Sequence, residues 1–267
     1  MPKVSVAMGI YNVGSTLSEA LDSLFNQTFQ DFEVILCNDG STDNTLDVAK
    51  KYKEKYPDKI VIIENEKNMG LNYTLNHCLE HCQGRYVARM DGDDLCDTTR
   101  FQKQVNFLDK HPEYGFVSSI MKYFDEDGEW GESKAKEKPE ALDFIYGIPF
   151  CHAPVMIRKE VYEAVGGYTV DKRLLRVEDY NLYMKMYAIG YKGYNLQEPL
   201  YSMRDGRDAI SRRVFKYRLN EFYAKCLAVK ELKLPVYGYI YAIRPLLVGM
   251  LPLPIYKILH KKRLSSK

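Results

Sequence analysis

Residues 86–94 read Tyr-Val-Ala-Arg-Met-Asp-Gly-Asp-Asp, a mostly apolar run that ends in three closely spaced carboxylates. A short apolar run that is followed by turn residues predicts a buried strand. Comparable runs occur upstream at residues 3–10, 32–37 and 60–63, and a stretch with helical spacing follows each of them. This alternation predicts an α/β fold, with a mostly parallel sheet and helices on both of its faces.

Signals for the ends of helices support this division of the chain. Thr16 and Glu19 have the spacing of a capping box, which predicts a helix that begins there and continues to about residue 27. A second helix is predicted to end before Pro57, and a third before Gly84. Further along, the pattern predicts helices at 98–110, 159–165 and 178–189 and strands at 116–124 and 154–157.

Polar loops follow all four of the first predicted strands. Because ligands of such sheets bind outside the carboxyl ends of the strands, these loops are expected to converge on one binding rim. They are Tyr11-Asn12, Asp39-Gly-Ser41, Asn68-Met-Gly70 and Asp91-Gly-Asp-Asp94.

Asp91, Asp93 and Asp94 are close enough to repel one another unless a cation or protons intervene. Carboxylate oxygens favour Mg²⁺, Mn²⁺ or Ca²⁺ over zinc. The alternative is a solvated acidic turn at the start of the helix at 98–110. The cation is favoured because residues 39–43, Asp-Gly-Ser-Thr-Asp, are expected on the same rim.

The spacing of the cysteines argues against disulfide bonds, and the spacing of two His and Cys pairs argues against a zinc site. The six cysteines are irregularly placed, which predicts free thiols rather than a disulfide framework. His77 and His81, and likewise Cys78 and Cys82, are four residues apart in a predicted helix. The two pairs are offset by about 100° around that helix, so we expect the cysteines in the core and the histidines on its flank.

Eight motifs in order give the chain a resemblance to a known family. They are Ile10-Tyr-Asn12, Asn38-Asp-Gly-Ser-Thr-Asp43, Asn68-Met-Gly70, Ala88-Arg-Met-Asp-Gly-Asp-Asp94, Arg100-Phe-Gln-Lys-Gln104, Gly166-Gly-Tyr168, Glu178-Asp-Tyr180 and Glu198-Pro-Leu200 with Arg204. Over roughly residues 1–213 the chain resembles the family 2 glycosyltransferases of bacterial surface polysaccharide synthesis. The resemblance implies the GT-A fold, a Rossmann-like sheet flanked by helices.

The resemblance also implies roles at the donor site. Asp39 would hydrogen-bond uracil, Asp91 would lie near the ribose, and Asp93 would hold Mn²⁺ or Mg²⁺ against the diphosphate. Asp94 is a second or alternative metal ligand. The complete set implied for the nucleotide-sugar is Ile10, Tyr11, Asn12, Asp39, Asn68, Gly70, Arg89, Asp91, Gly92, Asp93, Arg204 and Arg207.

Asp179 matches the general base of the family, which implies transfer with inversion at the anomeric carbon. Without the resemblance, the neighbouring acids Glu178 and Asp179 have a structural explanation, because a helix dipole favours carboxylates in the first turn of a helix. The resemblance places four residues on the acceptor or donor-sugar side: His152, Gly167, Tyr168 and Glu178.

The resemblance implies an enzyme that moves one sugar from a nucleotide-sugar, with UDP favoured, to a glycan or lipid-linked acceptor. The Gln-x-x-Arg-Trp signature of processive synthases is absent, since the single tryptophan is Trp130 in a different context. A sugar nucleotidyltransferase and a nucleotide-sugar-binding subunit without turnover are the alternatives. A nucleotidyltransferase needs a basic, glycine-rich loop after its first strand, whereas residues 10–15 carry no base.

The charge of the chain is unevenly distributed. Residues 212–267 contain 13 Lys and Arg against 2 acidic residues, whereas residues 1–211 contain 25 against 34. We therefore divide the chain into a catalytic domain at 1–211, with a nucleotide half at 1–96 and an acceptor half at 97–211, and a C-terminal helical extension. The net charge of +2 argues against a protein that coats nucleic acid.

The extension is basic and apolar. Residues 212–234 are predicted as a helix, and residues 235–260 as an apolar, aromatic segment that Pro245, Pro252 and Pro254 interrupt. A broken segment with flanking bases favours peripheral contact with an anionic membrane, although packing onto the catalytic domain is the alternative. The first residues lack the pattern of a secretory signal, so the expected location is the cytoplasmic face of the membrane.

Overall fold

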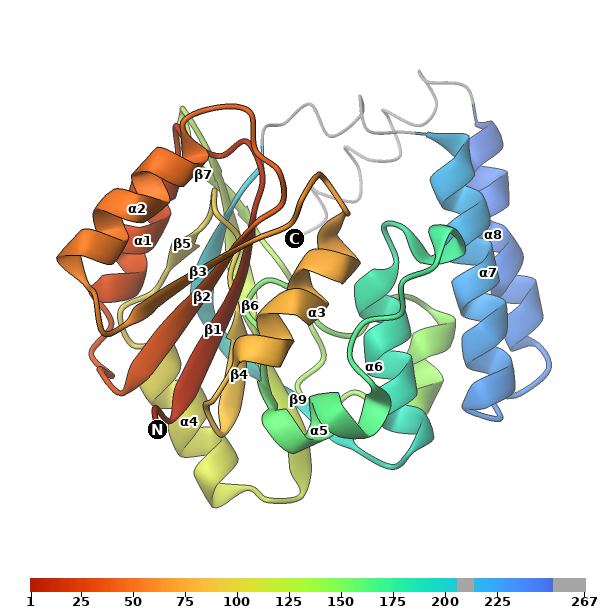
Figure 1. The fold of residues 1–267 in the computed structure, drawn as a ribbon. Helices are drawn as coiled ribbons and strands as arrows, with labels where there is room; N and C mark the ends of the chain where they lie inside the picture. Colours follow the sequence, from red (N-terminus) through yellow and green to blue (C-terminus); the bar gives the residue numbers. More distant parts are fainter. Residues whose placement is uncertain (206–213, 252–267) are drawn as a thin grey trace.

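The computed structural model describes residues 1–205 and 214–251. In these residues, nine strands form one sheet in the order β3-β2-β1-β4-β8-β6-β9-β5, with β7 paired to β6 (Figure 1). The strands are β1 (Val4–Ile10), β2 (Phe32–Asn38), β3 (Ile60–Glu64), β4 (Tyr86–Arg89), β5 (Leu95–Cys96), β6 (Tyr114–Asp125), β7 (Gly128–Glu132), β8 (Met156–Arg158) and β9 (Lys192–Arg204).

The sheet has a parallel half and a mixed half. Strands β3, β2, β1 and β4 are all parallel, as the alternating pattern predicted. Strand β8 is antiparallel to both β4 and β6, β9 is parallel to β6, and β5 is antiparallel to β9. The direction of the sheet therefore changes beside β4, the strand that precedes the three aspartates.

Helices cover both faces of the sheet, with α1 and α2 on one side and α3 and α6 on the other (Figure 1). The α-helices are α1 (Leu17–Phe25), α2 (Thr45–Lys55), α3 (Leu71–His81), α4 (Arg100–Lys110), α5 (Lys159–Val165), α6 (Glu178–Ala188), α7 (Phe215–Glu231) and α8 (Gly238–Met250). Two 3₁₀ turns, η1 (Ala141–Ile145) and η2 (Lys172–Leu174), lie in the connections.

Strand β9 was missed by the sequence analysis. Its sequence is polar in the middle and contains Pro199, which lacks the amide that a central strand uses for pairing. The register between β6 and β9 shifts between Ser119 and Ile120, and Ile120 then faces Pro199. An irregularity of this kind accommodates a proline inside a sheet, so the local pattern hid a strand that tertiary pairing forms.

The predicted capping box does not form, although the helix does. Thr16 occupies the N-cap of α1 without a capping hydrogen bond. Its hydroxyl instead contacts the carbonyl oxygens of Val13 at 3.3 Å and Gly92 at 3.1 Å. Glu19 forms an ion pair with Arg204 from the end of β9. Long-range contacts have replaced the local ones that the spacing suggested.

Helices α7 and α8 form an antiparallel hairpin at the edge of the molecule that lies beyond α6 (Figure 1). The prediction of a basic helix at 212–234 is confirmed for residues 215–231. Pro245 does not break α8, whereas Pro252 and Pro254 lie outside the described residues. No helix in the described part of the chain is long and apolar enough to cross a membrane.

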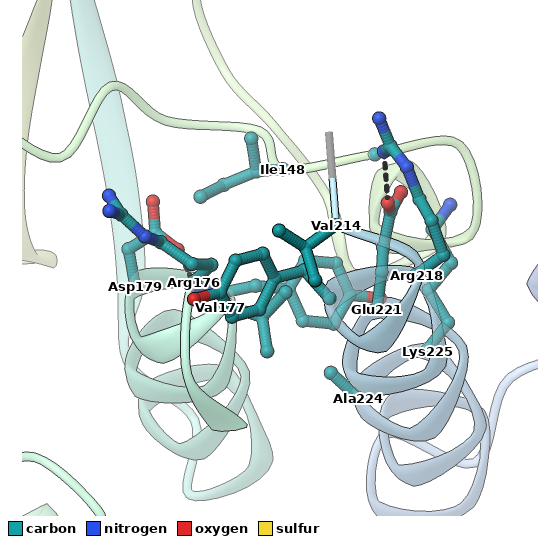
Figure 2. A pocket seen from close by; sticks show the side chains of 12 residues that line it. Ile148, Arg176, Val177, Asp179, Val214, Arg218, Glu221, Ala224 and Lys225 are labelled. Carbon is teal, nitrogen blue, oxygen red and sulfur yellow. Dashed lines mark hydrogen bonds and ion pairs between the residues drawn. The ribbon is translucent and has the colours of Figure 1, made fainter. Parts of the chain in front are cut away.

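A pocket of about 520 Å³ opens between α6 and α7 (Figure 2). Asp179 and Arg176 lie on its α6 side, and Arg218, Glu221 and Lys225 lie on its α7 side. The candidate base of the sequence analysis therefore borders the space that the C-terminal hairpin encloses against the catalytic domain.

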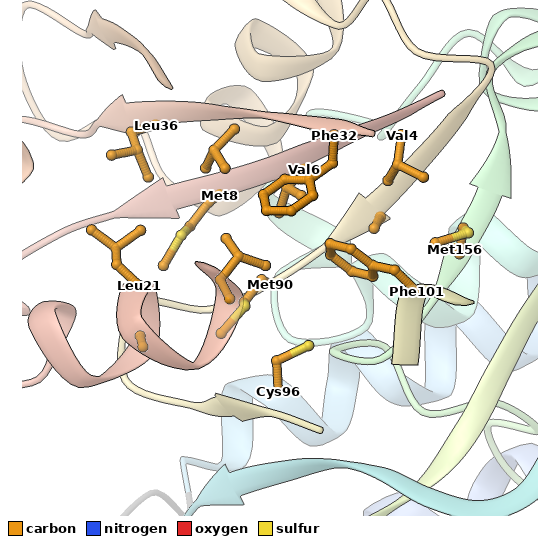
Figure 3. Close-up of a cluster of buried hydrophobic side chains, with 14 of the residues drawn as sticks. Val4, Val6, Met8, Leu21, Phe32, Leu36, Met90, Cys96, Phe101 and Met156 are labelled. Carbon is orange, nitrogen blue, oxygen red and sulfur yellow. The ribbon is translucent and has the colours of Figure 1, made fainter. Parts of the chain in front are cut away.

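Two hydrophobic cores lie on the two faces of the sheet. Alternation along each strand divides its side chains between them, so that Val6 and Met8 of β1 enter one core and Ala7 the other. The first core is shown in Figure 3, where Leu21 of α1 and Phe101 of α4 pack against the strands. The second core continues from the sheet through α3, α5 and α6 to Ala224 and Ala228 of α7.

Arg100 is fully buried at the point where β4 meets β8. Its Nη2 donates to the carbonyl oxygen of Arg89 at 2.8 Å and to that of Val155 at 3.3 Å. Its Nε donates to Gln104 Oε1 at 3.1 Å, and its guanidinium lies 5.1 Å from the centre of the Tyr201 ring. A single side chain thus joins the end of β4 to the backbone that precedes β8.

Replacing Arg100 with methionine should lower the free energy of unfolding by about 3 kcal/mol, because buried carbonyl oxygens lose their donor. Urea denaturation measures the change. Lys103→Met in the same helix is the matched control, since its exposed ion pair with Glu198 is worth at most about 1 kcal/mol. Equal losses in the two variants would contradict the role of Arg100.

Candidate active site

The acidic loop after β4 is built around one buried cation. Arg89 is 6% exposed, and its Nη2 donates to Asp91 Oδ1 at 2.6 Å. The backbone amide of Asp91 donates to the hydroxyl of Tyr201 at 3.1 Å. Gly92 is closely enclosed, because a Cβ there would lie 2.8 Å from Val13. The loop is therefore fixed from three directions before any ligand binds.

The end of β9 holds the carboxylate of Asp94 and the backbone of Asp93. The backbone amide of Arg204 donates to Asp94 Oδ1 at 2.8 Å, and its Nε donates to the carbonyl oxygen of Asp93 at 3.0 Å. The guanidinium also pairs with Glu19 and lies 4.5 Å from the centre of the Phe124 ring. In this structure Arg204 thus organises the acidic loop.

Asp93 and Asp94 carry more negative charge than their surroundings balance. Burial, together with the charges of Asp91 and Asp93, raises the pKa of Asp94 to about 7. Burial and the charge of Asp91 also raise the pKa of Asp93. Such carboxylates fit a divalent cation, which would relieve their repulsion.

The described residues contain no group of three or more His, Cys, Asp or Glu side chains arranged around one metal position. Mg²⁺ commonly takes one or two protein carboxylates and completes its shell with phosphate oxygens and water. The cysteines at 78 and 82 are buried and the ring of His81 is exposed, as expected from their offset on α3.

Asp39 is buried and holds the loop that follows β3. Its Oδ1 accepts from Asn65 Nδ2 at 2.7 Å and from the amide of Met69 at 2.8 Å, while Oδ2 accepts from the amide of Gly70 at 3.0 Å. A carboxylate has about four acceptor positions, so one remains on Oδ2 for a ligand donor. The side chain of Asn68 is exposed beside this site.

The loop after β1 presents an exposed ring and a strained turn. Tyr11 is 45% exposed, and Asn12 has a positive φ of 52°. Asn12 Oδ1 accepts from the amide of Thr42 at 2.8 Å, which ties this loop to the loop after β2. The side chain of Ile10 lies in the core, so only its backbone faces the rim.

Asp179 is half-buried in the first turn of α6. Its Oδ1 accepts from the amide of Tyr180 at 2.7 Å. Burial and the neighbouring charge of Glu178 raise the pKa of Asp179 to about 7, although the charge of Arg89 opposes the shift. A carboxylate with such a pKa can exchange a proton near neutral pH.

His152 and Tyr168 form a buried polar cluster behind this rim. His152 Nε2 lies 2.8 Å from the hydroxyl of Tyr168, which is 3.3 Å from that of Tyr162. Burial and the charge of Arg89 lower the pKa of His152, which favours the neutral ring. The carbonyl oxygen of Gly167 accepts from Lys185 Nζ at 2.7 Å.

The structure therefore brings the acidic loop, Asp39 and the loop after β1 to the carboxyl ends of the parallel strands. Arg207 lies outside the described residues. The sequence analysis missed three supporting side chains, Thr16, Asn65 and Tyr201, which contact the candidate residues through long-range hydrogen bonds. No local pattern indicates such contacts, because the strand that carries Tyr201 was itself not predicted.

Residues 5–166 match the family model described as glycosyl transferase family 2. This chain belongs to that family. It is 43% identical over 266 residues to EpsE of Bacillus subtilis (strain 168), provisionally named a glycosyltransferase, with 100% of this chain and 96% of the relative covered. This chain is also 34% identical over 230 residues to the UDP-Gal:alpha-D-GlcNAc-diphosphoundecaprenol beta-1,3-galactosyltransferase of Escherichia coli. The match covers 84% of this chain and 82% of that relative.

Solved structures confirm the GT-A fold that the motifs implied. TarS 1–349 of S. aureus in complex with UDP has a TM-score of 0.70 at 21% identity, covering 94% of this chain and 76% of TarS. The mannosyltransferase PcManGT of Pyrobaculum calidifontis, in complex with GDP-Man and Mn²⁺, has a TM-score of 0.69 at 20% identity, with 98% and 79% covered. Asp179 and the hairpin lie beyond the segment that the family model matches.

Replacing Asp39 with asparagine should lower the free energy of unfolding by about 2 kcal/mol, because an amide donor would face the N–H of Gly70. Thermal and urea denaturation measure the change. The exposed Asp58→Asn variant is the control and should change stability by less than about 0.5 kcal/mol. If the stability of Asp39→Asn matched the wild type, the carboxylate would not be holding the loop.

Proposed function

We propose that this glycosyltransferase moves one sugar, with inversion, from a UDP-sugar to a lipid-linked glycan acceptor during polysaccharide synthesis. Support for the donor comes from the Escherichia coli relative, whose name specifies UDP-Gal, and from a structural neighbour bound to UDP. Support for the acceptor comes from the same relative, whose name specifies a sugar on diphosphoundecaprenol.

The observation that carries this proposal is the placement of two carboxylate sites by the fold. Asp93 and Asp94 follow β4 and are held by the end of β9, and Asp179 lies in the first turn of α6 on the wall of an open pocket. The first site would bind the donor through a cation, and the second would meet an acceptor beside α6. A group that stabilises the leaving diphosphate and a base for the attacking hydroxyl are what a displacement at an anomeric carbon requires.

On the donor side, Asp93 and Asp94 are the proposed ligands of Mn²⁺ or Mg²⁺. A bound divalent ion would stabilise the negative charge that develops on the nucleoside diphosphate as it leaves. Asp91 is kept in position by Arg89 and the Tyr201 hydroxyl, which leaves its second carboxylate oxygen for the ribose. Asp39 would offer its remaining acceptor position to the N–H of the base ring.

On the acceptor side, Asp179 is the proposed general base. It would take the proton from the acceptor hydroxyl while that oxygen forms its bond to the anomeric carbon and the bond to the diphosphate breaks. Only the ionised carboxylate can accept this proton. With a pKa of about 7, Asp179 would be half ionised near neutral pH, so transfer should become faster as the pH rises through 7.

The variant Asp179→Asn should lose at least ~100-fold in transfer rate while it keeps its affinity for UDP within about twofold. UDP release from a panel of UDP-sugars, with Mn²⁺ and a sugar-diphosphate-lipid acceptor, measures the rate. The wild type should lose activity below pH 7, and chelation of the metal by EDTA should abolish it.

Asp171→Asn provides a matched control, because Asp171 is a partly exposed acid eight residues earlier that pairs with Arg173. This variant should retain the wild-type rate. Transfer by Asp179→Asn at the wild-type rate would contradict the role of Asp179 as the base. Transfer that persists in EDTA would contradict the proposed need for a metal.

Helix α8 supports a proposed peripheral contact with the cytoplasmic face of an anionic membrane. Exposed apolar side chains recur every three or four residues on one face of the helix and the turn before it. They are Val236, Ile240, Ile243, Leu247 and Met250. We call these five residues the outer stripe of α8. The opposite face, with Gly238, Ala242 and Pro245, is buried.

The small residues on that opposite face explain why the stripe points outward. A Cβ on Gly238 would lie 2.7 Å from Val229, so only glycine permits this approach of α8 to α7. The larger apolar side chains are consequently left on the solvent side. Exposed basic side chains on the described part of the hairpin, such as Lys230, Lys233 and Arg244, accompany the stripe, and basic and apolar groups together suit anionic lipid.

Replacing Ile240 and Leu247 together with glutamate should lower binding to vesicles of anionic phosphatidylglycerol by at least ~10-fold, because each change removes apolar area and adds repulsion. Co-sedimentation of the full chain measures binding. Ile189→Glu, on an exposed apolar residue of another surface, should bind like the wild type. Equal vesicle binding by all three proteins would exclude the stripe as the contact.

A further inference from the structure

The pocket between α6 and α7 combines apolar walls with an unusual set of charges. Its apolar lining comes from three segments that are far apart in the sequence and includes Ile148, Val177, Val214, Tyr217 and Ala224. Its volume of about 520 Å³ is that of a small-molecule site. Asp179 lies on its wall, so an occupant of this pocket would contact the proposed base.

Lys225 is a buried cation at this pocket without a carboxylate partner among the described residues. It is 5% exposed, and its Nζ donates to the carbonyl oxygen of Ile145 at 3.1 Å. An ammonium group has three donors, so two remain for another group. Burial lowers the pKa of Lys225, which reflects the cost of holding a charge there.

Arg176 places a second cation on the opposite wall (Figure 2). Its φ is 68°, a left-handed conformation that is unfavourable for a residue with a side chain. The guanidinium lies 6.0 Å from the centre of the Tyr217 ring, and within the described residues it forms no ion pair. The backbone thus keeps an unpaired guanidinium at the mouth of the pocket.

The remaining charges of the pocket are partly balanced. Arg218 pairs with Glu221 at 2.9 Å, one turn before Lys225 on the same helix. Asp179 is the other carboxylate of the lining. Lys225 and Arg176 are therefore the lining cations that form no ion pair within the described residues, and Figure 2 shows them at opposite ends of the pocket, Lys225 on α7 and Arg176 before α6.

We propose that this pocket binds the diphosphate of a polyprenyl-diphosphate-linked acceptor, with Lys225 and Arg176 on the phosphate oxygens and the first isoprene units against the apolar walls. The inference rests on the proposed function and specifies where its acceptor binds. A neutral glycan end would leave the buried ammonium unpaired, whereas a diphosphate supplies acceptors for it. The acceptor sugar would then extend toward Asp179.

The position of the pocket suits a lipid acceptor. One wall is α7, and α7 packs against α8, whose outer stripe is exposed. Because the stripe faces away from α7, an acceptor anchored in a membrane there would pass around the hairpin, with its sugar, its diphosphate and its first isoprene units leaving the lipid.

Isothermal titration of the full chain with farnesyl diphosphate tests this inference. Saturating UDP and Mg²⁺ are present throughout, so that the donor site cannot supply the diphosphate binding. Farnesyl diphosphate should bind at least ~10-fold more tightly than farnesol, which lacks the charge, and than inorganic diphosphate, which lacks the lipid. Equal binding of farnesol would overturn the role of the cations, and equal binding of inorganic diphosphate would overturn that of the walls.

Two variants address the cations separately. Lys225→Met keeps the length of the buried side chain, and Arg176→Asn introduces a residue that tolerates a positive φ. Each should weaken binding of farnesyl diphosphate by at least ~10-fold and leave UDP affinity unchanged. Lys230→Met, an exposed lysine on the same helix, is the control and should bind like the wild type.

The outcomes separate this inference from the proposed function. A chain that binds UDP but not farnesyl diphosphate, or variants that bind it as tightly as the wild type, would overturn the acceptor site alone. A chain that fails to bind UDP would instead contradict the proposed donor chemistry. If Lys225→Met proved unstable, the binding of farnesyl diphosphate by Arg176→Asn would decide whether the pocket cations hold the diphosphate, because the Arg176 side chain is exposed and its replacement should not disturb folding.

Discussion

The backbone carbonyls of Arg89 and Val155 both accept hydrogen bonds from the guanidinium of Arg100, and this contact fixes the place where the sheet changes direction. On one side of it, the parallel strands deliver their loops to a common rim. On the other side, β8 runs in the opposite direction and β9 returns beside β6. The return of β9 brings the Tyr201 hydroxyl, which accepts from the amide of Asp91, and the Arg204 amide, which donates to Asp94, to the acidic loop. The loop is therefore rigid because the sheet is mixed.

Charge in the described residues is distributed so that opposite signs would face the two proposed substrates. The nucleotide rim has Asp91, Asp93 and Asp94 around the single buried Arg89, and two of these carboxylates are left with raised pKa values. The pocket beside α7 has cations in excess. Asp179 lies between the two environments, where burial keeps its pKa near neutrality. A divalent metal would neutralise the negative charge of Asp93 and Asp94, and a phosphate would neutralise the positive charge in the pocket beside α7.

The first hundred residues could be predicted from the sequence because each strand there is an uninterrupted apolar run that ends in a polar loop. That regularity also located Asp39 and the acidic loop. Strand β9 could not be predicted, since its stability comes from pairing with β6 around Pro199. For the same reason, the contact of Tyr201 with the acidic loop was unforeseeable. The capping box at Thr16 failed because the hydroxyl had a distant partner in Gly92.

The absence of α8 from the two cores of the described residues affects the order in which the chain acquires structure. Helix α7 shares the second core through Ala224 and Ala228, whereas α8 contributes no side chain to either core in the described residues. Domains fold as units during synthesis, from the N-terminal end. The catalytic core can therefore close before α8 leaves the ribosome. The outer stripe of α8 would then emerge beside an already folded catalytic core, where it could make the proposed membrane contact.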